Sequence, residues 1–136
     1  MPSVHSTNYF NTLILVSPDC TATVGTVPQK PGTVAAIQYE MLSASPYQMT
    51  SDDLLLAVEA RRRGVKRDKL PAFKKVFFSQ PHACLRGSPL VKSYGWGIHH
   101  DANGRVALVG CETGQYKTFV DDPNVKKVAG MRSRRA

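Results

Sequence analysis

The pattern of apolar and polar positions predicts a strand near the start of the chain, followed by helices. Residues 9–16, YFNTLILV, are rich in β-forming side chains and precede a Ser-Pro-Asp turn signal, which is typical of a strand. From Thr33 onward the apolar residues recur at helical spacing. This helix is expected to end near Ser45, because Pro46 disfavours helical geometry in the residue before it.

Residues 50–64, TSDDLLLAVEARRRG, carry signals for both ends of a second helix. Thr50 or Ser51 can accept hydrogen bonds from the free amides of the first turn. The two aspartates that follow face the positive end of the helix dipole, and Arg61–Arg63 face its negative end. Gly64 can leave the helix with a positive φ. A third helix is expected to start near residue 68, because a proline is tolerated in the first turn and the apolar residues that follow share one side.

The segment YGWGIHHDANGRVALVG predicts a β-hairpin that turns at Asn103-Gly104. With a two-residue turn, Ala102 pairs with Arg105, and two sets of residues share a face: Trp96, Ile98 and His100 with Ala107, Val109 and Cys111; and Gly95, Gly97, His99 and Asp101 with Val106, Leu108 and Gly110. A three-residue loop with a bulge would change these faces.

These elements together predict an α+β fold. The expected architecture is a small antiparallel sheet, including the hairpin in the C-terminal half of the chain, packed with three to four helices, one of them short and near 113–122. Residues 1–125 are expected to form a single domain, and residues 126–136 a basic C-terminal tail.

Length and cysteine content narrow the class of protein. A chain of 136 residues is ordinarily one domain, and no stretch reaches the ~20 apolar residues of a membrane-spanning helix. The three cysteines, Cys20, Cys84 and Cys111, are odd in number and widely spaced, unlike a disulfide framework. MPSVHSTNYF lacks the features of a signal peptide. We therefore expect a cytoplasmic protein with reduced thiols and no membrane association.

The positive charge is concentrated in two segments. The chain has 18 Lys+Arg and 10 Asp+Glu, and residues 61–75 and 126–135 together hold 13 of the 18 cations. Clustered cations can bind a polyanion such as nucleic acid by releasing its counterions. The alternative is that the first segment serves a helix end and the second is a solvated arm. The candidate polyanion-binding residues are Arg61, Arg62, Arg63, Lys66, Arg67, Lys74, Lys75, Arg132, Arg134 and Arg135.

A second hypothesis places a small-ligand or enzyme pocket beside the hairpin. Aromatic and cationic side chains alternate in this region, and such an arrangement can hold a ligand if the side chains converge. Its candidate residues are Arg86, Ser88, Tyr94, Trp96 and His99. The alternative interpretation is that Trp96 packs in the hydrophobic core. A third hypothesis is a structural protein that self-associates through a hairpin edge or an apolar face.

Catalytic and metal-binding motifs are not evident. His99-His100-Asp101, with Cys84, Cys111 and His82, offers a thiol, an imidazole and a carboxylate. Adjacent histidines on a strand nevertheless point to opposite faces. The sequence contains no H-E-x-x-H, no paired C-x-x-C and no phosphate-binding glycine loop. We therefore predict no metal, no cofactor and no catalytic residue.

The chain also resembles a family of small uncharacterised bacterial proteins that form a domain of unknown function. The resemblance rests on TNYFNT, SPYQMTSDD, CLRGSPLVKSYGWGIH and the closing KKVAGMRSRR. Gly87 stands where that family usually has alanine. The resemblance implies a single stand-alone bacterial domain and carries no activity, substrate or cofactor. A non-enzymatic module that binds a polyanion is therefore the first expectation for function.

Overall fold

The computed structural model describes residues 6–132, and these residues form the predicted α+β fold. Along the chain the elements are β1 (Thr12–Leu15), α1 (Val34–Ala44), α2 (Ser51–Arg62), η1 (Arg67–Lys69, 3₁₀), α3 (Leu70–Phe78), η2 (Leu85–Gly87, 3₁₀), α4 (Pro89–Ser93), β2 (Trp96–His100), β3 (Val106–Gly110), α5 (Gly114–Asp121) and β4 (Lys126–Ala129). Residues 6–132 thus contain five α-helices, more than the three to four expected. None of the helices in this range is long and apolar enough to cross a membrane.

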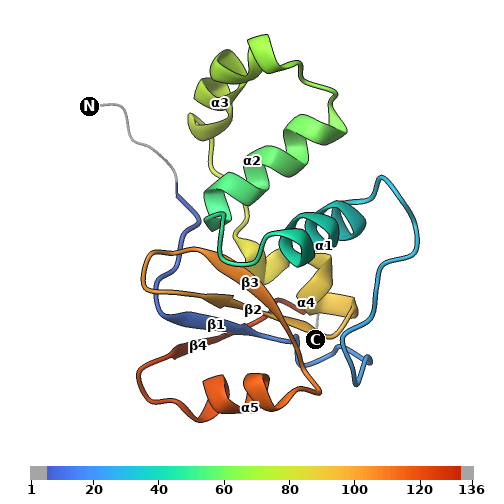
Figure 1. Ribbon diagram of the computed structural model, residues 1–136, viewed down its shortest axis with the longest axis vertical. Coiled ribbons are helices and arrows are strands. Elements are labelled where there is room, and N and C mark those ends of the chain that lie inside the picture. Colours follow the sequence, from blue (N-terminus) through green and yellow to red (C-terminus); the bar gives the residue numbers. More distant parts are fainter. Residues whose placement is uncertain (1–5, 133–136) are drawn as a thin grey trace.

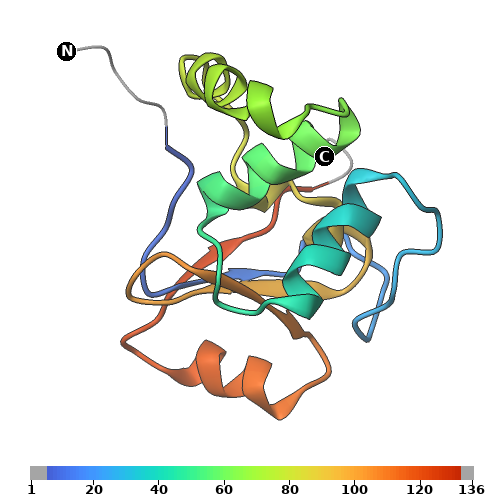
Figure 2. The same ribbon diagram turned by 45° about the horizontal axis from the view of Figure 1, so that its top comes forward.

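The four strands form one sheet in the order β3-β2-β1-β4. The β1–β2 and β2–β3 pairs are antiparallel, whereas β1 and β4 are parallel. Helices cover both faces (Figures 1 and 2): α5 lies on one, while α1, α2 and α4 lie on the other, and α3 packs on α2 away from the sheet. The sheet is therefore mostly antiparallel and is sandwiched between unequal helical layers.

The main core lies between the sheet and the larger helical layer. Apolar side chains from three strands meet those of α1, α2, η2 and α4 there, which removes them from water and stabilises the fold. Its fully or nearly fully buried members are Ile14, Ile37, Leu42, Leu54, Val58, Leu85, Val91, Ile98 and Val106. On the opposite face, α5 packs its aromatic residues against the sheet, with Phe119 stacked on His99 at 3.9 Å between ring centroids.

The hairpin turn is one residue longer than the sequence predicted. The Asp101 amide donates to the Arg105 carbonyl at 2.9 Å, so the loop consists of residues 102–104. The Asp101 carboxylate accepts from the amides of Asn103 and Arg105, and Gly104 has φ of +79°. These features close a three-residue loop with a glycine in the left-handed region, as in a bulged hairpin.

This loop shifts the register and corrects the predicted faces. Trp96 lies opposite Gly110 and His100 lies opposite Val106, so the predicted pairing of Ala102 with Arg105 is wrong. One face carries Trp96, Ile98, His100, Val106, Leu108 and Gly110, and the other carries Gly97, His99, Ala107 and Val109.

The segment assigned to a basic tail begins as a strand instead. Lys126–Ala129 pair in parallel with β1, from Thr12 opposite Lys126 to Leu15 opposite Ala129. Two further backbone hydrogen bonds extend this ladder at its ends: the Lys126 amide donates to the Asn11 carbonyl and the Gly130 amide to the Leu15 carbonyl, each at 2.8 Å. Residues 126–129 therefore satisfy the open edge of β1, which corrects the prediction of a tail that starts at 126.

The predicted helix ends of α2 are confirmed. The Thr50 hydroxyl accepts from the Asp53 amide at 3.2 Å, and the Asp53 carboxylate accepts from the Thr50 amide at 3.1 Å, which is a complete capping box. Gly64 has φ of +62°, as expected for a residue that leaves a helix. Helix α4 was not predicted, although Ser88 caps it and Pro89 occupies its first turn.

Candidate functional site

The first basic segment occupies the end of α2, all of η1 and the middle of α3. Three of its cations are paired with carboxylates: Arg61 with Glu40 at 3.2 Å, and Arg62 and Arg63 with Glu59 at 3.1 Å. The arginines are 45–67% exposed, so these pairs contribute little to stability. They do bring two acidic side chains among the three arginines and so reduce the local positive charge.

The other cations of this segment are exposed and unpaired. Among residues 6–132, the structure gives no ion pair or side-chain hydrogen bond to Lys66, Arg67, Lys69, Lys74 or Lys75. Because η1 runs directly into α3, Arg67 and Lys74 are seven residues apart on nearly continuous helical backbone. That spacing is about two helical turns, so the two side chains project from similar sides. The candidate polyanion surface is therefore carried by η1 and α3.

The second basic segment begins on β4, whereas the first lies on α2, η1 and α3. Figures 1 and 2 both show α3 at one end of the molecule and β4 within the sheet. The Lys127 ammonium group donates to the carbonyls of Asp122 and Val125, so it serves the turn before β4. Arg132 is exposed, whereas Arg134 and Arg135 lie outside the described residues. The structure thus places Lys126 and Lys127 in the sheet and apart from α3.

The five residues of the predicted hairpin pocket do not converge. Ser88 is 4% exposed, and its hydroxyl donates to the Gln38 side-chain carbonyl at 2.6 Å in the core. Arg86 donates from Nε to the Ala129 carbonyl at 2.6 Å, which ties η2 to the edge strand β4. The two side chains therefore have structural contacts in different places.

Of the three aromatic candidates, Trp96 and Tyr94 both bond Thr26, whereas His99 lies elsewhere. The Trp96 indole donates to the Thr26 carbonyl at 2.8 Å and lies against Tyr39 of α1. His99 projects from the opposite face of β2, where its Nδ1 bonds the Tyr47 hydroxyl at 2.9 Å. Tyr94 ends α4, and its carbonyl accepts from Thr26. The structure therefore does not support a pocket built from these five residues.

The histidines and cysteines that were weighed for metal binding or catalysis are likewise separated. His99 and His100 lie on opposite faces of β2, as their adjacency requires. Cys84 contacts the Tyr9 hydroxyl at 3.4 Å, and this hydrogen bond, with burial, raises the pKa of Tyr9. Across residues 6–132 no three His, Cys, Asp or Glu side chains are grouped so as to hold a metal ion.

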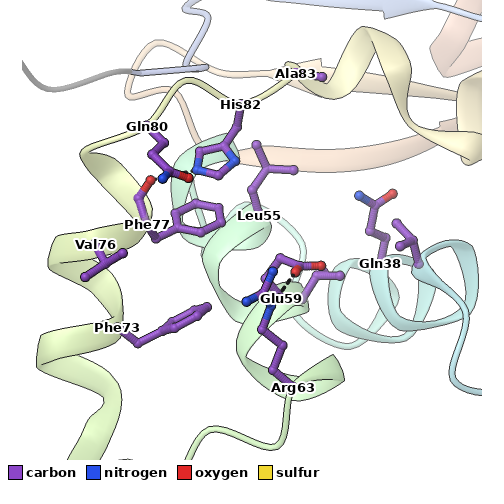
Figure 3. Close-up of a pocket in the computed structure, with 12 residues that line it drawn as sticks. Gln38, Leu55, Glu59, Arg63, Phe73, Val76, Phe77, Gln80, His82 and Ala83 are labelled. Atoms are coloured by element: carbon purple, nitrogen blue, oxygen red, sulfur yellow. Dashed lines mark hydrogen bonds and ion pairs between the residues drawn. The ribbon is translucent and has the colours of Figure 1, made fainter.

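A pocket that the sequence did not predict lies between α1, α2 and α3 (Figure 3). Its volume is about 370 Å³, within the range of about 300–1,000 Å³ that is usual for small-ligand sites. We call it the α1–α3 pocket. It is lined by Val34, Gln38, Leu55, Val58, Glu59, Arg63, Phe73, Val76, Phe77, Gln80, His82 and Ala83.

Seven of the twelve residues that line the α1–α3 pocket are apolar, and the five polar ones are Gln38, Glu59, Arg63, Gln80 and His82. Phe77 is 8% exposed and is stacked on His82 at 3.7 Å between ring centroids. A ring nitrogen of His82 bonds the Phe77 carbonyl at 2.7 Å, which holds the segment after α3 against that helix. The spacing of Phe73 and Phe77 predicted an apolar side of a helix, but gave no sign that this side borders a cavity.

Comparison with protein families agrees with the predicted resemblance. The model of a family of unknown function, DUF6157, matches residues 4–136. The chain belongs to this family. Searches of curated proteins and of solved structures found no match to the chain. The family supplies no activity or ligand, so the function has to be argued from the geometry above.

Proposed function

We propose that this domain binds a polyanionic partner, with nucleic acid as the first candidate, through the cations of η1 and α3. The observation that carries the proposal is the presence of five exposed cations between residues 66 and 75 that have no partner within residues 6–132. Cations that already bond carboxylates must give up those bonds to meet a phosphate, whereas these five are free to do so.

The helix that carries these cations is held in place by the buried side chain of Phe77. Phe73 and Phe77 line the α1–α3 pocket and Phe77 is buried, while Lys74 and Lys75 are exposed. The lysines of α3 therefore face solvent on a helix that is anchored by its aromatic side chains. A helix with fixed position and outward cations suits the phosphate backbone of a duplex or single strand.

Arg61–Arg63 have a secondary role in this proposal. Glu40 and Glu59 hold them in the free protein, so a phosphate would have to compete with these carboxylates. Arg132, Arg134 and Arg135 belong to a second basic segment that can add contacts to a long partner. The main affinity is assigned to Lys66, Arg67, Lys74 and Lys75.

Fluorescence anisotropy with labelled 20-nucleotide single- and double-stranded DNA tests the proposal. We expect binding that weakens as salt is raised from 50 to 200 mM. In the variant with Lys66, Arg67, Lys74 and Lys75 all changed to Gln, the salt slope on duplex DNA is expected to fall by about 0.9 for each lost phosphate contact.

A matched control removes four cations that lie outside both basic segments: Lys30, Lys92, Arg105 and Lys117, each changed to Gln. Both variants lose four positive charges, so a general effect of net charge weakens binding equally in both. The proposal requires the η1–α3 variant to lose much more affinity than the control. Equal losses, or binding that does not respond to salt, would refute it.

A further inference from the structure

We propose that the α1–α3 pocket is a binding site for a small, neutral, mainly apolar molecule that carries a carbonyl oxygen. This inference is independent of polyanion binding, because Lys66, Arg67, Lys74 and Lys75 do not line the pocket. It rests on an unpartnered hydrogen-bond donor of a largely buried side chain in the pocket wall, on the apolar residues of the walls, and on the balance of charge in the lining.

The donor is the side-chain amide of Gln38. Gln38 is only 2% exposed, and its carbonyl oxygen accepts from the Ser88 hydroxyl at 2.6 Å. The Ser88 oxygen in turn accepts from the Leu90 amide at 3.1 Å, so its single proton is free to serve Gln38. In this chain of bonds the Gln38 amide has its oxygen toward Ser88 and its nitrogen on the other side.

The same orientation leaves the NH₂ group of Gln38 without a protein partner. This nitrogen donates no hydrogen bond to any group within residues 6–132, although the residue lines the pocket. Figure 3 shows the nitrogen end of the amide directed toward Leu55 and the interior of the pocket. The nitrogen is reached from the pocket, so water can meet it in the free protein and an acceptor atom of a ligand can replace that water.

The remaining walls favour an apolar body. Leu55, Val58, Phe73 and Phe77 contribute aliphatic and aromatic surface, and Val76 at the same pocket is 62% exposed. A flat or branched hydrocarbon in the pocket would cover this exposed valine and contact the two phenylalanines. Removal of that apolar surface from water would favour binding. The pocket therefore combines an apolar cradle with one oriented donor, which is the usual composition of a small-molecule site.

The charges that line the pocket do not select an ion. Glu59 and Arg63 both line it, and they pair with each other at 3.1 Å, so their formal charges cancel. A carboxylate ligand would be repelled by the Glu59 carboxylate as much as it is attracted by the Arg63 guanidinium, and it would lose its own hydration. A neutral carbonyl group avoids both costs and still accepts from Gln38.

Titration with three related probes, followed by ¹⁵N NMR of the whole chain, tests this site. The probes are 2-naphthamide, which has a neutral carbonyl group, 2-naphthoate, which has a carboxylate, and naphthalene, which has neither. We expect 2-naphthamide to shift the side-chain resonances of Gln38 and to bind about tenfold more tightly than naphthalene, from one added hydrogen bond. The naphthoate is expected to bind more weakly than the amide.

Two variants locate the binding. Ala83 is exposed and lines the pocket, so Ala83→Phe fills the pocket from its rim and is expected to lower the affinity for 2-naphthamide at least about tenfold. Ala72→Phe places the same side chain at an exposed position of α3 that does not line the pocket, and is expected to bind like the parent. Gln38→Met removes the donor, and we expect this variant to bind 2-naphthamide only as tightly as it binds naphthalene.

Each part of the proposal is overturned by a particular result. Equal affinity of the parent for 2-naphthamide and naphthalene overturns the role of Gln38, and tighter binding of the naphthoate overturns the neutral ligand. Unchanged binding in Ala83→Phe overturns the location, as does the absence of any binding to the parent. If Gln38→Met does not fold, the probe series and Ala83→Phe still decide. The η1–α3 glutamine variant should bind the amide normally, which keeps this test distinct from that of polyanion binding.

Discussion

Replacement of His100 should change how the stability of this protein depends on pH. His100 is fully buried on β2, and neither ring nitrogen has a hydrogen-bond partner within residues 6–132. The ring of Tyr9 lies edge-on to it at 5.4 Å. Burial lowers the pKa of His100 from 6.5 to about 4; a charge on His99 acts in the same direction, and Asp101 opposes it.

The sign and size of the effect follow from this pKa. In the unfolded chain the imidazole binds a proton near pH 6.5, whereas in the folded chain it stays neutral until about pH 4. The contribution of neutral His100 to the free energy of unfolding is therefore fully present above pH 6.5. This contribution is lost as the pH falls toward 4, and it does not change further below pH 4. The loss attributable to His100 is about 3 kcal/mol.

His100→Leu removes the titrating group and keeps a similar volume. At pH 7.5 we expect the variant to be at least as stable as the parent, because two unpaired buried nitrogens are removed. Urea unfolding followed by the fluorescence of Trp96, the single tryptophan, gives the free energy of unfolding at each pH. The difference between variant and parent should grow by about 3 kcal/mol between pH 7.5 and pH 4.

A second variant, His100→Gln, separates titration from polarity. It is polar but does not titrate, so it should lose the same pH dependence even if it is less stable throughout. Other groups titrate in all three proteins, and their effect cancels in the differences. Parallel pH profiles for the parent and His100→Leu would refute the reasoning, as would an NMR titration that places the pKa of His100 near 6.5.

Three further substitutions test the local geometry by urea unfolding at pH 7.5. Thr50→Ala breaks the capping box of α2 and should cost about 1 kcal/mol, whereas the exposed Ser43→Ala should cost less; equal costs would contradict the role of the cap. Gly97→Ala would place a Cβ 2.6 Å from the Tyr116 ring and 3.1 Å from the Ile14 carbonyl oxygen, and should cost about 1–3 kcal/mol. Gly114→Ala, where a Cβ meets nothing within 4 Å, is its control and should not destabilise. Tyr47→Phe removes the hydroxyl bonded to His99 and should cost about 1 kcal/mol, and no change would show that this bond adds nothing.

Features that depend on residues close together in the chain could be predicted from the sequence. The capping box joins Thr50 to Asp53, and Pro46 follows directly on the predicted end of α1 at Ser45. Such signals act within one turn, so they are visible in a short stretch of sequence. The hairpin at Asn103-Gly104 was predicted for the same reason. Its register was not, because the Asp101 side chain bonds two loop amides and favours the longer loop.

In the candidate sites, too, local features could be predicted from the sequence, whereas contacts between distant segments could not. The basic segment from 61 to 75 is a run of sequence, and its location on α2, η1 and α3 follows from the helices predicted there. Which of its cations are free was decided by Glu40 on α1, which pairs with Arg61, and by Glu59 one turn before Arg63. The residues of the predicted hairpin pocket do not converge, because Trp96 and His99 are three residues apart on β2 and lie on opposite faces of the sheet.

By itself the sequence determined the α+β class, most helix ends, and the segregation of positive charge. Only the tertiary structure decided that residues 126–129 close the sheet beside β1, and that Gln38, Phe77 and His82 border one cavity. These features join segments that are distant in the chain, and no local pattern of residues encodes such a meeting. They arise because an open strand edge must be paired and because helices bury their apolar sides against whichever surface the fold presents.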